Sequence, residues 1–312
     1  MRSGGARTIG LFLVLNFCGA ASAMDLTRAA VVYPAKFAGP EKKAIDVLVE
    51  EVAKRTQVRW AAGSARPGPQ SPFISVDRSS GAPEGYSIRV RNGGVEVTGN
   101  DARGVLFGVG RLLRTLRMSR GSIVIPDGFQ ITTAPKYSLR GHQLGYRPKP
   151  NSYDGWTVEV WDQYIRDLAV FGANAIELIP PRSDDASDSP HFPLPQMEMM
   201  TRMSGIVNDY GLDVWIWYPA MDPDYANPKT VESALTEWGD VFRKLPRVDA
   251  VFVPGGDPGH TQPKYLMALL EKQTKVLRRY HPKAQIWVSR KALRRRGPMN
   301  SLRFSRLSSR PG

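Results

Sequence analysis

From residue 138 onward, strand-like and helix-like segments alternate regularly, and this rhythm constrains the fold more than any other feature. Short apolar runs predict strands at 138–146, 174–179, 213–218, 250–253 and 285–289. Between them, apolar residues recur at helical spacing over 157–171, 194–210, 229–244 and 263–280. Repeated βα units of this kind predict a parallel sheet with outer helices.

Two architectures satisfy this pattern, an open doubly wound sheet and a (β/α)₈ barrel. No G-x-G-x-x-G loop follows any of the expected strands, which weakens the nucleotide-binding open sheet. A barrel needs eight strands, and the alternation stops after five. We therefore expect residues 137–289 to form an incomplete (β/α)₈ TIM barrel of about five βα units.

The segment 290–312 breaks the pattern, with eight basic residues and no acidic one. We expect it to be a non-native or disordered tail of a truncated chain. The alternative is a natural basic tail. Without this tail, Arg2 and Arg7, the net charge of +14 falls to +4, so we expect no nucleic-acid partner.

Residues 28–132 have a different organisation. Strands are expected at 29–33, 73–77, 122–126 and 129–132, and a hairpin at 86–97 turns at Asn92-Gly93-Gly94. One helix begins near Pro40 and a second is capped by Asn100 or Asp101. This order predicts an α+β N-terminal domain whose strands can share one sheet, followed by a linker at 133–136.

The N-terminus has the features of a secretory signal peptide. Arg2 and Arg7 precede an apolar run at 9–17, and Ala21-Ser22-Ala23 follows. We expect cleavage after Ala23 and a secreted or periplasmic protein; a buried N-terminal helix is the alternative. No later stretch approaches the ~20 apolar residues of a membrane span, so no membrane partner is expected after cleavage.

Cysteine chemistry is excluded from the expected mature chain. The single cysteine of the sequence, Cys18, lies inside the predicted signal peptide and would be removed with it. Disulfides, thiol catalysis and cysteine–zinc sites therefore do not arise. The loose spacing of Asp184, Asp185 and Asp188 does not favour calcium, and we expect no metal and no cofactor.

In a barrel, reactive groups gather at the carboxyl ends of the strands. Aromatic side chains, carboxylates, Arg and His follow the expected strands here, a mixture that suits sugar stacking and hydroxyl binding. Asp257, in the run Gly255–Gly259, is the candidate catalytic carboxyl, with an Asx turn or helix cap as its alternative. The candidate substrate-binding residues are Arg140, His142, Trp217, Asp222 and His260.

Each of these binding residues also has a structural interpretation. Arg140 can pair with a carboxylate, His142 can lie in the core, Asp222 can end a strand and His260 can simply lie on the loop. Trp215 and Trp217 alternate with Ile216 and share one face, where core packing is the expected role of at least one.

Two segments carry a resemblance to a known superfamily. GYSIRVRNGGVEVTGNDARGVLFGVGRLLRTL, at 85–116, resembles the α+β domain that precedes the catalytic barrel in bacterial β-N-acetylhexosaminidases and in α-glucuronidases. APKYSLRG, at 134–141, resembles the entry into those barrels, and the resemblance implies that Arg140 holds the sugar.

The fourth expected strand separates the two families. The hexosaminidase pattern G-G-D-E has its general acid where Pro258 stands here, whereas Asp257-Pro258-Gly259 is similar to the α-glucuronidase pattern. YGLDVWIWY, at 210–218, also resembles the α-glucuronidase third strand, and Gly145 stands where hexosaminidases have Asp.

The resemblance implies a secreted glycoside hydrolase of polysaccharide catabolism, β-N-acetylhexosaminidase-like or α-glucuronidase-like, whose partner is an oligo- or polysaccharide. We expect the truncated chain itself to be inactive, because hydrolysis needs two opposed carboxyl groups. A non-catalytic carbohydrate-binding relative is the alternative.

Overall fold

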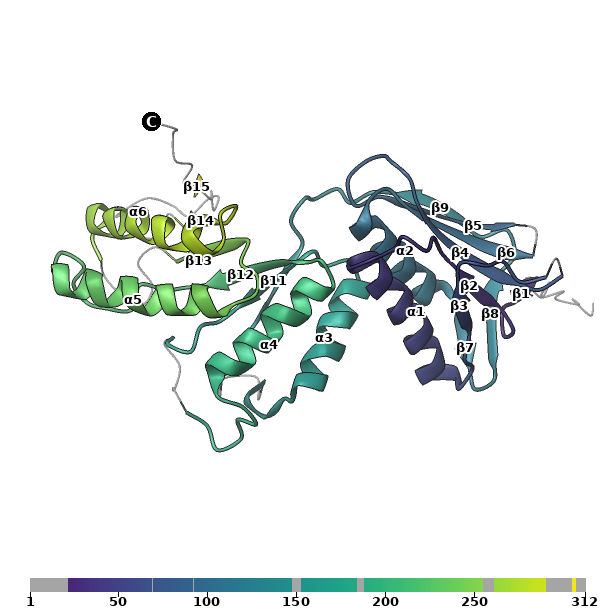
Figure 1. Cartoon of the computed structure of the whole chain (residues 1–312), viewed down its shortest axis with the longest axis horizontal. Coiled ribbons are helices and arrows are strands. Elements are labelled where there is room, and N and C mark those ends of the chain that lie inside the picture. The colour runs from purple at the N-terminus through teal and green to yellow at the C-terminus, as the bar shows by residue number, and fades with distance from the viewer. Residues whose placement is uncertain are drawn as a thin grey trace, which may run out of the picture.

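The structure is a computed structural model, and it describes residues 22–68, 70–91, 93–147, 153–183, 188–254, 261–289 and the backbone of 305–306. An α+β region is followed by an α/β region, and the helices α1 and α2 lie beside α3 where the two regions meet (Figure 1). Within the described ranges, no helix has the length and apolar character to cross a membrane.

Two sheets and two long helices make up the N-terminal domain. One sheet has the strand order β3-β2-β4-β6-β5-β9 and the other the order β1-β8-β7. The expectation of a single sheet was wrong, because β8 pairs with β1 and β7 instead of with the larger sheet. The elements are β1 (Ala23–Asp25), β2 (Ala30–Val32), α1 (Pro40–Thr56), β3 (Ala61–Gly63), β4 (Phe73–Arg78), β5 (Tyr86–Arg91), β6 (Gly94–Gly99), α2 (Ala102–Thr115), β7 (Arg117–Ser119), β8 (Ser122–Pro126) and β9 (Gln130–Thr133).

Helix α2 forms for reasons that are visible in its sequence. The Asp101 side chain caps it by accepting a hydrogen bond from the Gly104 amide at 2.7 Å. Val105, Val109 and Leu112 recur at helical spacing and are fully buried. Such a face must pack against another element, and α2 lies against α1 and β6.

The C-terminal region has a parallel sheet in the order β10-β11-β12-β13-β14, with β15 antiparallel at its edge. This order follows the chain without the reversal that defines a doubly wound sheet. The elements are β10 (Gly141–Leu144), α3 (Val158–Val170), β11 (Ala175–Leu178), α4 (Gln196–Asp209), β12 (Asp213–Trp217), α5 (Pro228–Lys244), β13 (Ala250–Val253), α6 (Pro263–Tyr280), β14 (Gln285–Val288) and β15 (Ser305–Arg306), with a 3₁₀ turn at Tyr153–Gly155.

The two faces of this parallel sheet differ in burial. Alternate residues such as Ile176, Val214 and Ile286 are fully buried on the face that the helices cover. The residues between them, among them Glu177, Trp215 and Trp287, are only partly buried. Because side chains alternate along a strand, a second row of side chains lines the opposite face.

Charged side chains join the two regions. Arg103 of α2 donates to the Gly211 carbonyl at 2.7 Å and forms an ion pair with Asp213 at the start of β12. Arg166 of α3 is buried and contacts Glu51 of α1, with 3.3 Å between Nη1 and Oε1. Gly211 has a positive φ of 69°, and a Cβ there would collide with the Pro40 ring.

Candidate functional site

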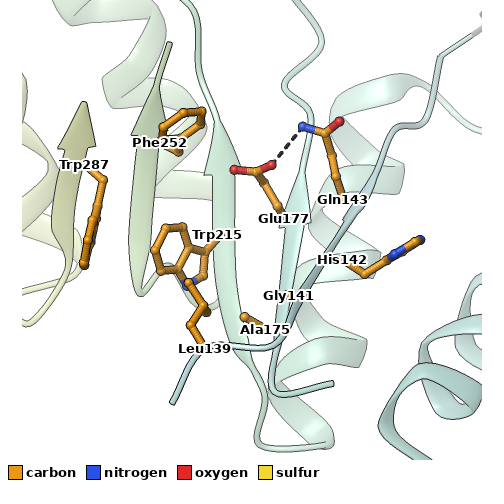
Figure 2. A pocket seen from close by; sticks show the side chains of 9 residues that line it. All are labelled: Leu139, Gly141, His142, Gln143, Ala175, Glu177, Trp215, Phe252 and Trp287. Carbon is orange, nitrogen blue, oxygen red and sulfur yellow. Dashed lines mark hydrogen bonds between the residues drawn. The ribbon is translucent and has the colours of Figure 1, made fainter. Parts of the chain in front are cut away.

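A cavity of about 450 Å³ opens on the uncovered face of the parallel sheet (Figure 2). Its walls come from all five parallel strands and from Leu139, two residues before the first strand. The lining residues are Leu139, Gly141, His142, Gln143, Ala175, Glu177, Trp215, Phe252 and Trp287. This volume lies within the range of about 300–1,000 Å³ typical of small-molecule sites.

A carboxyl and an amide lie side by side in this cavity. Gln143 and Glu177 are register partners on β10 and β11, and Gln143 Nε2 donates to Glu177 Oε2 at 2.8 Å. Burial raises the pKa of Glu177 above its ordinary value, and the hydrogen bond from Gln143 opposes that rise. Glu177 therefore holds its proton to a higher pH than a solvent-exposed glutamate.

Aromatic rings face this pair. Trp215 is the register partner of Glu177 on β12, and its ring centroid lies 5.6 Å from that of Trp287 on β14. Trp217, a predicted sugar-binding residue, lies on the same face and is the register partner of Phe252. Trp215 and Trp217 are both half-buried and neither belongs to the hydrophobic core, so the core packing expected for one of them is not seen.

Arg140 lies at the boundary between the two domains. Its guanidinium donates to Glu84 Oε2 at 2.6 Å, to the Gly172 carbonyl at 2.7 Å and to the Tyr137 carbonyl at 2.8 Å. It precedes β10 and is not among the residues that line the cavity. The structure gives Arg140 an interdomain role, and sugar binding by this side chain stays a prediction.

His142 is the register neighbour of Ile176 on the helix-covered face. Its side chain points away from Gln143 and Glu177 (Figure 2) and its Nε2 lies 3.4 Å from the Tyr164 hydroxyl of α3. His142 is exposed, so the core alternative was wrong. His142 thus lines the cavity with its side chain pointing away from the polar pair, whereas Trp217 lies on the cavity face of the sheet without lining the cavity itself.

Asp222 follows β12 and is held in an ion pair. Arg182, which follows β11, donates to Asp222 Oδ1 at 2.6 Å and to Glu237 Oε2 of α5 at 2.8 Å. The hydrogen bond from Arg182 lowers the pKa of Asp222 in spite of its partial burial. Asp222 is therefore an ionised side chain that joins two βα connections, and its predicted contact with substrate is untested.

The predicted catalytic Asp257 and the predicted binding residue His260 lie outside the described residues, as do Asp184 and Asp185. Among the residues that the structure does describe, no group of His, Cys, Asp and Glu could hold a metal ion.

The sequence interpretation missed Glu177 and Gln143. The sequence does contain a signal that could have identified Glu177, because it is a carboxylate inside the otherwise apolar run 175–179. Gln143 gave none, since its importance depends on its being the register partner of Glu177.

Comparison with known proteins connects this fold to carbohydrate-active enzymes. Residues 19–133 match the family model "Glycosyl hydrolase family 20, domain 2". Lacto-N-biosidase of Bifidobacterium bifidum is 25% identical over 173 residues, which cover 54% of this chain and 15% of that protein.

Solved structures share the arrangement of both regions. The family 20 β-N-acetylhexosaminidase of Streptomyces coelicolor A3(2) superposes with a TM-score of 0.65 at 15% identity, covering 85% of this chain and 63% of its own. A mutant β-hexosaminidase of Streptomyces plicatus in complex with the product GlcNAc gives 0.63 at 15% identity, covering 85% and 62%.

This chain thus spans less than two thirds of the length of each of these relatives. At this identity, the superpositions establish the fold: an α+β domain followed by a partial α/β region. The predicted resemblance to the β-N-acetylhexosaminidase superfamily is confirmed.

Proposed function

Starting from this relationship to the β-N-acetylhexosaminidase superfamily, we propose that the chain is a glycoside-hydrolase-type protein that acts on an oligo- or polysaccharide. The observation that carries the proposal is the cavity, in which Trp215, Phe252 and Trp287 face the Gln143–Glu177 pair beside a family 20 domain. Aromatic faces and a few polar groups are the usual means of holding a sugar ring.

Hydrolysis itself needs an acid at the leaving oxygen and a second carboxyl group. We propose Asp257 as the acid, on the sequence Gly255-Gly256-Asp257-Pro258-Gly259. In a full-length relative, the change that corresponds to Asp257→Asn keeps the size of the side chain but loses the proton, so hydrolysis should fall by about 10²–10⁴-fold while sugar binding persists. A panel of aryl glycosides, including an N-acetyl-β-glucosaminide and an α-glucuronide, tests both activity and sugar preference.

The α-glucuronidase-like activity is a second candidate, supported by the Asp257-Pro258-Gly259 sequence. A non-catalytic carbohydrate-binding protein is the third. Turnover of the glucuronide alone favours the second, and binding without any turnover by the full-length protein favours the third.

Export, barrel architecture and inactivity belong to the same proposal. We propose that residues 1–23 are a cleaved signal peptide, which intact-mass measurement of exported protein tests; a mass that includes Met1 would contradict it.

We propose that 137–289 is part of a (β/α)₈ barrel and that the 312-residue chain alone does not hydrolyse glycosides. The truncation expected from residues 290–312 stays a prediction, which sequencing of the locus tests.

A further inference from the structure

The Gln143–Glu177 pair lies where both side chains can form hydrogen bonds with a molecule bound in the cavity. Gln143 and Glu177 occupy neighbouring strands at the same register, and Trp215 follows at that register on the third strand. The hydrogen bond between the two polar side chains fixes both at one side of the cavity, opposite the Trp287 ring (Figure 2). An amide and a carboxyl group together present donors and acceptors, which vicinal hydroxyl groups require.

The charge of the cavity restricts what it can hold. Its nine lining residues, all within the described part of the chain, include no Lys or Arg. The one basic side chain among them, His142, points away from Glu177. An anionic sugar would thus meet a carboxyl group without a countercharge, in surroundings that are largely apolar.

From this geometry we propose that the cavity binds one uncharged pyranose, which packs against the neighbouring rings of Trp215 and Trp287 and has its hydroxyls held by the Gln143–Glu177 pair. The inference deepens the proposed function and rests on it. It assigns the preference for a neutral sugar over a uronate to Glu177, and Glu177 acts here as a binding group.

Burial supports this assignment, because the raised pKa of Glu177 favours the protonated acid that can donate to a hydroxyl. The competing role for the same side chains is internal packing, since barrel interiors are normally filled by layers of side chains. Packing alone predicts no affinity for sugar and no discrimination by charge.

The test measures binding of methyl β-glucopyranoside, methyl β-N-acetylglucosaminide and methyl β-glucuronoside to the full chain by calorimetry and saturation-transfer NMR. We expect the two neutral glycosides to bind at least about tenfold more tightly than the glucuronoside. Glu177→Ala should weaken the neutral glycosides about tenfold or more, the effect of one lost buried hydrogen-bonding group.

The Glu177→Gln variant keeps the size of the side chain but removes its ionisable carboxyl group, so it distinguishes the effect of shape from the effect of charge on binding. It keeps a donor and an acceptor, so neutral binding should stay within about threefold, while the glucuronoside should gain affinity because its carboxylate no longer faces a carboxyl group that can ionise. Glu198→Gln, an exposed glutamate of α4 paired only with Arg202 in the described contacts, is the control and should change nothing.

Binding of neutral glycosides without hydrolysis supports the inference and agrees with the inactivity proposed for this chain, whereas the proposed catalysis is tested separately on a full-length relative. Unchanged binding of the neutral glycosides in Glu177→Ala overturns the inference and leaves the catalytic proposal standing. Equal affinity for neutral and uronate sugars, or no binding of any glycoside, also overturns it.

Discussion

Glu84 joins the two domains through several hydrogen bonds. Its carboxylate accepts hydrogen bonds from Arg103, Arg140 and Asn174, and its own amide donates to Asp101 at 2.7 Å. Its φ of 58° lies in the left-handed region that side chains rarely adopt. No local pattern in the sequence could identify this role, because its partners Arg140 and Asn174 lie 56 and 90 positions further along the chain.

Glu84→Ala should lower the free energy of unfolding by about 2–3 kcal/mol. The substitution removes the carboxylate that pairs with Arg140 and one of the two carboxylates that pair with Arg103, and the partial exposure of both arginines keeps the cost below that of a fully buried pair. Chemical denaturation measures the effect. Glu271→Ala, at an exposed position of α6, is the control, and an equal loss in both variants would contradict the prediction.

Glu177 should make stability depend on pH in the opposite way to a paired carboxylate. Its pKa is raised in the folded state, so the free energy of unfolding falls as pH rises from its ordinary value of 4.5 through the folded value. Glu177→Gln removes this loss, and the variant should gain stability relative to the wild type as the pH rises above 4.5. Denaturation curves across that range test it; a difference that does not vary with pH would rule it out.

At the scale of elements, helices were easier to predict than sheet membership. Amphipathic spacing placed α3 to α6 within a few residues of their bounds, and the Pro40 and Asp101 signals placed the starts of α1 and α2. The strands β1, β3 and β7 were missed, because three residues are too few to show alternation. The expected strand 138–146 is β10, Gly141–Leu144, and its pairing with β11 is a long-range fact that no local pattern contains.

Helix α2 meets α3 through a glycine. A Cβ at Gly110 would lie 2.6 Å from the Val170 carbonyl oxygen, so Gly110→Ala should force the helices apart and destabilise the fold by at least about 1–3 kcal/mol. Gly205, inside α4, has open space at its Cβ position, and Gly205→Ala should stabilise by up to about 1 kcal/mol. We expect the melting temperature to fall in Gly110→Ala and to rise in Gly205→Ala. Shifts of the same sign in both variants would contradict the close approach of Gly110 to the Val170 carbonyl.

At the scale of the whole molecule, ion pairs between α1 and α3 join the two regions. Arg166, only 10% exposed, contacts both Glu50 and Glu51. The Glu51 side chain is 2% exposed; burial opposes its ionisation, yet hydrogen bonds from Arg55 and Gln163 lower its pKa. The stability it contributes is present above the ordinary pKa of glutamate and is lost as pH falls through the folded value.

Glu51→Gln should therefore cost about 2 kcal/mol at pH 7 and progressively less in acid. Glu50→Gln is the matched control: it contacts the same arginine, but its carboxylate is 56% exposed, so its cost should stay below about 1 kcal/mol. Equal costs for the two variants, or a Glu51→Gln cost that persists at pH 3, would contradict the prediction.

The interdomain contacts also limit which gene fusions can succeed. A recombination crossover in the connection at 134–140 would look harmless, since it divides no helix or strand. It would nevertheless place Glu84 and Arg103 in a different parent sequence from their partners Asn174 and Asp213. It would also separate Pro40 from Gly211, whose missing side chain leaves space for the proline ring. Chimaeras with homologous enzymes should consequently fold only when the grafted half carries matching residues at these positions.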